Sequence, residues 1–178
     1  MSEKLLVING MRFDYKGIFE FDELLKVAHK AVTERGYVKH EKKFDEKVMP
    51  EGKEIYIELR PRKSKTAYYQ LMIKIKITMK KLTEVKVTMN GLPRSMYQGE
   101  VTIVFDAWTT TDYEDRWGNK PVLYFLKTFI NKYIYKFPLE SGFPGEVADD
   151  TRYVYNQIRS ALGLYKFKTS ASKIEKVI

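Results

Sequence analysis

Apolar and polar residues alternate with a period of two along several segments of the chain, a pattern typical of strands with one buried face. The longest segment covers residues 69–80, and shorter ones cover residues 54–60, 84–89 and 97–106. Because these segments follow one another through short turns, they predict an antiparallel, meander-like sheet. The side chains expected on its buried face are Ile55, Ile57, Leu71, Ile73, Ile75, Ile77, Val85, Val87, Val101 and Ile103.

Apolar residues recur at helical spacing in three other segments. The first covers residues 22–35, and Gly36 is expected to end it. The second covers about residues 121–137, with a proline suited to its first turn. The third covers residues 149–162, and Gly163 is expected to cap it. The sequence therefore predicts one helix near the N-terminus and two near the C-terminus.

Asn-Gly pairs and short polar runs mark the expected turns. Asn9 and Gly10 accept the positive φ angles of a type I′ turn, which predicts two short strands joined as a hairpin within residues 5–15. Residues 81–83 and residues 90–93 are the other turns expected between strands.

These elements predict an α+β fold, in which the helices pack on one face of a curved antiparallel sheet of about five to seven strands. The length of 178 residues fits one domain with a core of its own. We expect residues 1–167 to form this domain and residues 168–178 to form a polar, basic and flexible tail.

The composition excludes several kinds of site. The chain contains no cysteine, which excludes disulfides, thiolate metal sites and a cysteine nucleophile. The N-terminal apolar run is too short for a signal peptide, and no stretch reaches the ~18 apolar residues of a membrane span. We therefore expect a cytoplasmic protein. Its many lysine and glutamate residues are common in thermophile proteins.

Positive charge is concentrated in one part of the chain. The formal net charge is +9, and residues 61–90 contain eight basic residues and one acidic residue. Alternation places several of these lysines on the polar side of the predicted sheet. Such a surface would attract a polyanion, and aromatic side chains among the cations could stack on bases. The residues expected to bind it are Tyr56, Arg60, Arg62, Lys63, Lys65, Lys74, Lys76, Lys80 and Lys86.

Nucleic acid or an acidic protein is thus the predicted partner, and two alternatives remain open. A curved sheet with a long aromatic helix resembles the element order of helix-grip domains, which implies a carrier of a small hydrophobic ligand. A subunit that binds other proteins, or has only a structural role, is the other alternative. In both alternatives the lysines only cover a solvent-exposed face of the sheet, where they prevent sheets of different molecules from associating edge to edge.

Catalytic and metal sites find little support in the sequence. Asp106, Asp112, Glu114 and Asp115 could together hold a divalent cation, but their spacing fits no known cation loop. No phosphate-binding glycine loop, nucleophile elbow or paired-histidine zinc motif is present. The sequence therefore favours a non-enzymatic protein without a cofactor.

Overall fold

A computed structural model describes residues 3–66, 68–89, 92–111, 142–170 and 174–176 of the chain. In this part all strands pair antiparallel within one sheet, as the alternation predicts. The long strands follow the spatial order β1-β6-β5-β3-β2, and the short strands β4 and β7 both pair with β5. The strands are β1 (Glu3–Phe19), β2 (Glu41–Met49), β3 (Gly52–Leu59), β4 (Arg62–Ser64), β5 (Tyr69–Met89), β6 (Leu92–Thr111) and β7 (Ile174–Lys176).

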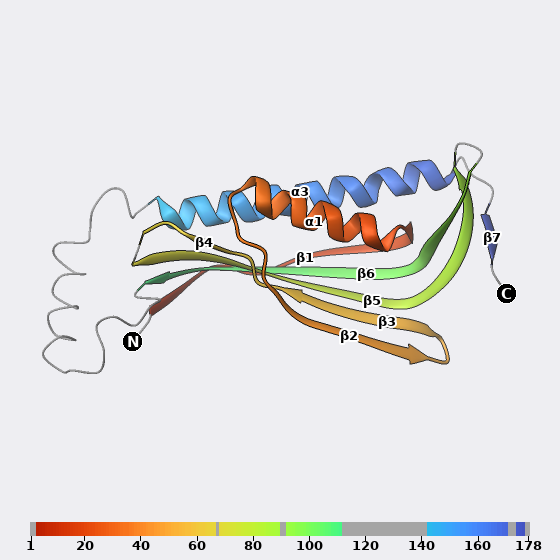
Figure 1. Cartoon of the computed structure of the whole chain (residues 1–178), viewed down its shortest axis with the longest axis horizontal. Helices are drawn as coiled ribbons and strands as arrows, with labels where there is room; N and C mark the ends of the chain where they lie inside the picture. Colours follow the sequence, from red (N-terminus) through yellow and green to blue (C-terminus); the bar gives the residue numbers. More distant parts are fainter. Residues whose placement is uncertain (1–2, 67, 90–91, 112–141, 171–173, 177–178) are drawn as a thin grey trace, which may run out of the picture.

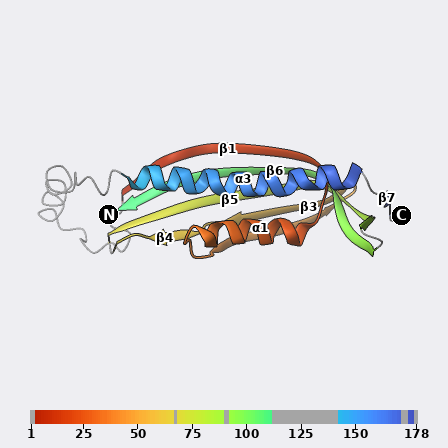
Figure 2. The same ribbon diagram turned by 90° about the horizontal axis from the view of Figure 1, so that it is seen from above.

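Two helices are described, and both lie on the same face of the sheet (Figures 1 and 2). Helix α1 (Phe21–Glu34) leads from one edge strand, β1, to the other, β2. Helix α3 (Phe143–Ser170) runs along the sheet beside α1. The first helix confirms the prediction for residues 22–35, and Gly36 follows it with a φ of 78°. Of the two C-terminal helices expected, the one near residues 121–137 lies outside the described residues.

The core is the layer between the helices and the sheet. Alternate residues of β5 and β6 point into it, and α1 and α3 add their apolar sides, so that one cluster of buried side chains spans both layers. Burial of this apolar area is the main favourable term for the fold. Fully buried members include Leu24, Leu71, Ile73, Ile75, Ile77, Ile103, Phe105, Val154, Ile158 and Leu162.

Two predicted turns are wrong, because the strands continue through them. The Asn9-Gly10 pair does not close a hairpin: β1 is one strand with a bulge, where residues 9 and 10 together oppose Asp106. Gly10 has a φ of 66°, so it adopts the left-handed conformation expected for the turn, but it does so within the bulge. Residues 81–83 likewise form a bulge inside β5, with Lys81 at a φ of 53°.

The last helix is longer than expected. Gly163 lies inside α3 and does not cap it, because the helix continues to Ser170. Residues 168–170 are the end of α3, and Ile174–Lys176 form strand β7, which pairs with β5 at Val85–Val87. No helix in the described ranges is long and apolar enough to cross a membrane.

Alanine substitutions at Gly99 and Gly163 should have opposite effects on stability. A Cβ at Gly99 would lie 2.8 Å from the Lys80 carbonyl oxygen, whereas a Cβ at Gly163 would meet nothing within 4 Å. We expect Gly99→Ala to lower the free energy of unfolding by about 1–3 kcal/mol, since the bulge must shift. Gly163→Ala should raise it by up to about 1 kcal/mol, because alanine favours a helix. Urea denaturation measures the free energy of unfolding of both variants. Equal changes in the two variants would contradict the close packing at Gly99.

Candidate nucleic-acid interface

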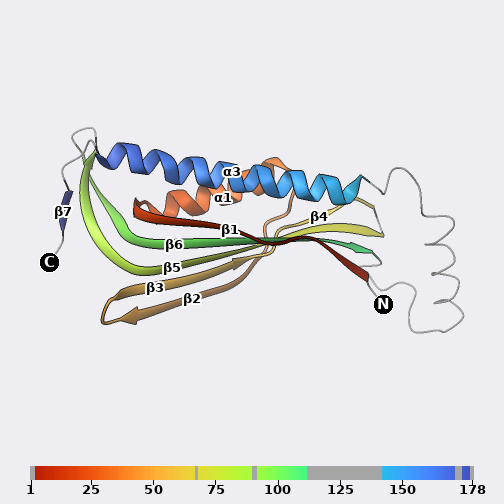
Figure 3. The ribbon, with the colours of Figure 1, turned by 180° about the vertical axis from the view of Figure 1, so that it is seen from behind.

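The face of the sheet turned away from α1 and α3 is here called the outer face (Figure 3). On β5, Ile73, Ile75 and Ile77 point to the helices and are fully buried. Lys74 and Lys76 alternate with them and therefore lie on the outer face. This is the orientation on which the predicted polyanion site depends.

The structure brings five of the predicted site residues together on the outer face. Arg62 of β4 pairs with Met72 of β5, and Tyr56 of β3 pairs with Thr78, so both side chains lie on the same side as Lys74 and Lys76. Arg60 follows β3 and contacts the same group through Glu58. Lys80 lies further along β5 and is exposed.

Two buried carboxylates lie among these cations. Glu58 accepts hydrogen bonds from the Tyr56 hydroxyl at 3.0 Å and the Arg60 Nε at 2.5 Å, and its Oε2 lies 4.0 Å from the Lys74 Nζ. Asp106 lies 3.2 Å from the Lys76 Nζ. It also accepts a 2.8 Å hydrogen bond from the Gly10 N–H at the bulge of β1. The outer face is therefore an ionic network and not a row of unpaired lysines.

The pKa values at this network reflect both burial and the neighbouring charges. Burial alone would raise the pKa of Glu58, but the hydrogen bonds from Tyr56 and Arg60 and the charge of Lys74 outweigh it and lower that pKa. The pKa of Lys74 is lowered, first by burial and then by Lys76 and Arg60, although Glu58 opposes this. The lowered pKa of Lys74 therefore reflects its burial before its charged neighbours.

A row of four side chains with Trp108 among them crosses the outer face beside this network. Trp108 of β6 pairs with Leu6 of β1 on one side and with Met72 of β5 on the other, and Met72 in turn pairs with Arg62. We call these four residues the Trp108 row. Leu6 is 44% exposed, and Trp108 and Met72 are partly exposed. Sequence reasoning missed the row, although Trp108 continues the alternation of Val104 and Asp106.

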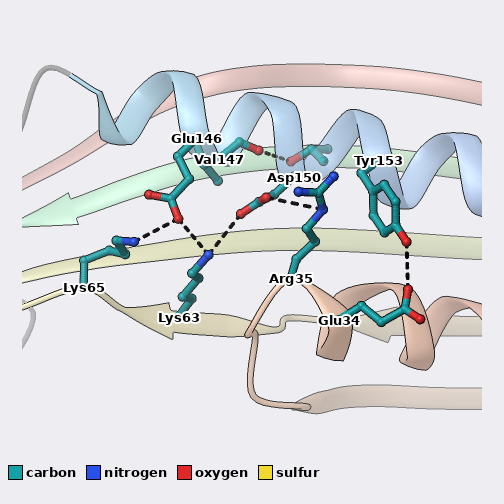
Figure 4. A network of polar contacts seen from close by, with 9 residues as sticks. Glu34, Arg35, Lys63, Lys65, Glu146, Val147, Asp150 and Tyr153 are labelled. Carbon is teal, nitrogen blue, oxygen red and sulfur yellow. Dashed lines mark hydrogen bonds and ion pairs between the residues drawn. The ribbon is translucent and has the colours of Figure 1, made fainter.

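Lys63 and Lys65, also predicted for the site, lie on the opposite side of the sheet (Figure 4). Lys63 pairs with the buried Leu71, and both lysines point toward the start of α3. The Nζ atoms of Lys63 and Lys65 lie 2.7 and 2.9 Å from Glu146 Oε1, and Lys63 also lies 3.4 Å from Asp150. These four residues form what we call the helix-side cluster.

The helix-side cluster continues into α1. Arg35 Nε lies 3.7 Å from Asp150, and the guanidinium group stacks over the ring of Tyr153 at 4.0 Å. The Tyr153 hydroxyl donates a 2.8 Å hydrogen bond to Glu34. Burial, followed by the charge of Asp150, raises the pKa of the nearby Tyr37 hydroxyl. The cluster therefore joins α1, β4 and α3, which is a structural role.

The last predicted cation, Lys86, lies apart from the others. It follows the bulge of β5 and pairs with Ser95 of β6 and Glu175 of β7. The side chains predicted for one site thus occupy three places: the outer face, the helix-side cluster and the curved end of β5.

The alternative metal site is not assembled in the described residues. Asp106 is engaged by Lys76 and Gly10, and Asp112, Glu114 and Asp115 lie outside the described residues. Within the described ranges no three histidine or acidic side chains stand close enough to hold a metal ion.

The described residues form an α+β domain in which the helices cover one face of an antiparallel sheet and leave the outer face uncovered by them. Comparisons with protein-family models, with curated proteins and with solved structures found no match to this chain.

The helix-side cluster predicts how stability depends on pH. Burial alone would raise the pKa of Glu146, but the hydrogen bonds from Lys63 and Lys65 outweigh it and hold that pKa below its ordinary value of 4.5. The charged form therefore stabilises the fold above pH 4.5, and this stabilisation is lost as the pH falls through the lower, folded pKa.

We expect Glu146→Gln to lower the free energy of unfolding by about 1 kcal/mol at neutral pH, because the carboxylate is partly exposed. In acid, the variant and the original protein should have the same free energy of unfolding. Urea denaturation across the pH range measures it. Asp149→Asn, at an exposed pair on the same helix, is the control and should change stability by less than about 0.5 kcal/mol. A pH-independent loss at Glu146 would contradict the ionic explanation.

Proposed function

We propose that the protein is a non-enzymatic binding module that holds single-stranded nucleic acid on its outer face. The observation that carries the proposal is the Trp108 row, in which an indole lies between Leu6 and Met72, with Arg62 on the far side of Met72. Stacking of a base on an aromatic side chain contributes about 1–3 kcal/mol and tolerates any base. Neighbouring cations would hold the phosphates.

The charges at this end of the outer face support an anionic ligand. Four cationic side chains, Arg60, Arg62, Lys74 and Lys76, stand beside the two carboxylates of the network. The side chains of Glu58 and Asp106 are each 10% exposed, whereas those of Arg60 and Lys76 are 31% and 34% exposed. The acids therefore lie beneath the cations, and a ligand would meet the cations first.

The same surface supports a second candidate, an acidic protein partner. Tryptophan, methionine and arginine are enriched in protein interfaces, and Leu6 offers exposed apolar area at the edge of the row. Nucleic acid is the first candidate because Arg62 of β4 and Lys74 of β5 lie close to Met72, the neighbour of the indole on β5. A carrier of hydrophobic ligands has less support, since the facing side chains of α3 and β5 pack together in one buried cluster.

Anisotropy titrations of labelled single-stranded DNA and RNA test the first candidate. We expect Trp108→Ala to weaken binding about tenfold or more, through loss of stacking. Arg62→Ala should reduce the slope of log Kd against log salt by about 0.7–1, because one phosphate contact is lost.

Lys30→Ala is the matched control, because it removes one exposed lysine from α1 on the other side of the sheet. It should leave both Kd and the salt slope unchanged. Circular dichroism checks that each variant is folded. Absence of binding at low salt, or equal affinity for the Trp108→Ala variant, would reject the nucleic-acid proposal.

A second variant should strengthen binding. Glu58→Gln keeps the size of the side chain but removes the charge that partly neutralises Arg60 and Lys74. We expect affinity for the oligonucleotide to increase about two- to fivefold and the salt dependence to become steeper. The control Asp22→Asn removes an acidic charge from α1 and should leave Kd unchanged. Weaker binding by the Glu58→Gln variant at equal stability would argue against a polyanionic ligand.

A further inference from the structure

Strand β2 is one edge of the sheet. It ends the strand order, and within the described residues it pairs with β3 alone. Figure 1 shows β2 as the outermost strand, on the side away from β1. An edge strand offers a row of backbone N–H and C=O groups that another strand can pair with.

The side chains of β2 leave this edge accessible and partly apolar. Phe44 pairs with the buried Ile57 and so points to the helix side of the sheet, yet it is 48% exposed. Val48 lies on the same side and is 83% exposed. Exposed aromatic and branched side chains on a strand are stabilised when a neighbouring strand packs beside them.

The charges along β2 are complementary to those of a second β2 that runs antiparallel to it. If two copies pair antiparallel with Phe44 opposite Phe44, Lys43 of each copy stands opposite Asp45 of the other. By symmetry this contact forms twice, and the bulge of β2 between Glu41 and Lys43 ends the regular strand just beyond it. Opposed residues share a face of the sheet, so opposite charges are neighbours.

The neighbouring registers each place a like charge opposite itself. With Asp45 at the centre, Asp45 faces itself and Lys43 faces Lys47; with Glu46 at the centre, Asp45 faces Lys47 but Glu46 faces itself. Like charges directly opposite one another are destabilising. Charged residues on an edge strand usually prevent association, but in the register centred on Phe44 they favour it.

We propose that β2 pairs with β2 of a second copy of this chain, antiparallel and centred on Phe44, so that one sheet continues through a symmetric dimer. The twofold axis is perpendicular to the sheet, because antiparallel edge pairing keeps the faces of both sheets aligned. Both outer faces then lie on the same side of the dimer. The proposal uses the edge of the sheet and is independent of the ligand of the outer face.

Single cysteines test the register directly, since the chain contains no cysteine. Opposed Cα atoms in an antiparallel pair are about 4.5–5.5 Å apart, within the range of a disulfide. Mild oxidation of Phe44→Cys should give a covalent dimer on a non-reducing gel. Val48→Cys is the matched control: its two copies would be roughly 26 Å apart and should remain unlinked. Failure of the Phe44→Cys variant to link, or linkage of Glu46→Cys in its place, overturns the proposed register.

Charge reversal tests the dimer itself by light scattering after size exclusion. The original protein should have twice the mass of one 21.0 kDa chain. Lys43→Asp and Asp45→Lys should each weaken association at least about tenfold, because they place like charges opposite one another. Mixing the two variants should restore a dimer, since each then meets the opposite charge. Restoration also shows that both variants are folded. A monomeric original protein, or a mixture no more associated than its components, overturns the proposal.

Discussion

Burial of the inner face of β5 and β6 beneath α3 and α1 is the interaction on which the rest of this structure depends. It orients every second side chain of both strands toward the helices and therefore turns the residues between them outward. Ile73, Ile75 and Ile77 are buried for this reason, and Lys74 and Lys76 share the outer face as a consequence. The position of the candidate site thus follows from the packing of the core.

Carboxylates that are buried or partly buried organise the cations on both sides of the sheet. Glu58 and Asp106 hold Arg60, Lys74 and Lys76 on the outer face, and Glu146 and Asp150 hold Lys63 and Lys65 against α3. A buried charge without a partner is costly, so each carboxylate is surrounded by donors. On the helix side this arrangement joins three elements. On the outer face it leaves the cations above the acids, where a ligand can reach them.

The two proposed surfaces use different parts of the same sheet. The Trp108 row lies on the outer face across β1, β6, β5 and β4, whereas dimerisation uses the free edge of β2. Pairing at the edge would double the number of outer faces without covering the Trp108 row. For a single-stranded ligand, two sites on one side would allow one molecule to contact both chains, which strengthens binding through effective concentration.

Local patterns in the sequence determined the elements whose geometry depends on near neighbours. The period of 3.6 residues predicted α1, Gly36 marked its end, and the period of two predicted which side chains of β5 are buried. The same pattern placed Lys74, Lys76 and Tyr56 on one face. The antiparallel sheet and its class of fold were therefore accessible from the sequence.

The tertiary structure decided whatever depends on the pairing of distant segments. Gly10 needs a positive φ in a hairpin turn and in a bulge alike, and only the pairing of β1 with β6 selects the bulge. Lys63 lies next to Arg62 in sequence but on the other face, because β4 pairs with β5 as a strand. The contact of Lys76 with Asp106 and the position of Trp108 beside Met72 require the register of β5 against β6. Local patterns in the sequence do not reveal that register, since it is set by the packing of the whole core.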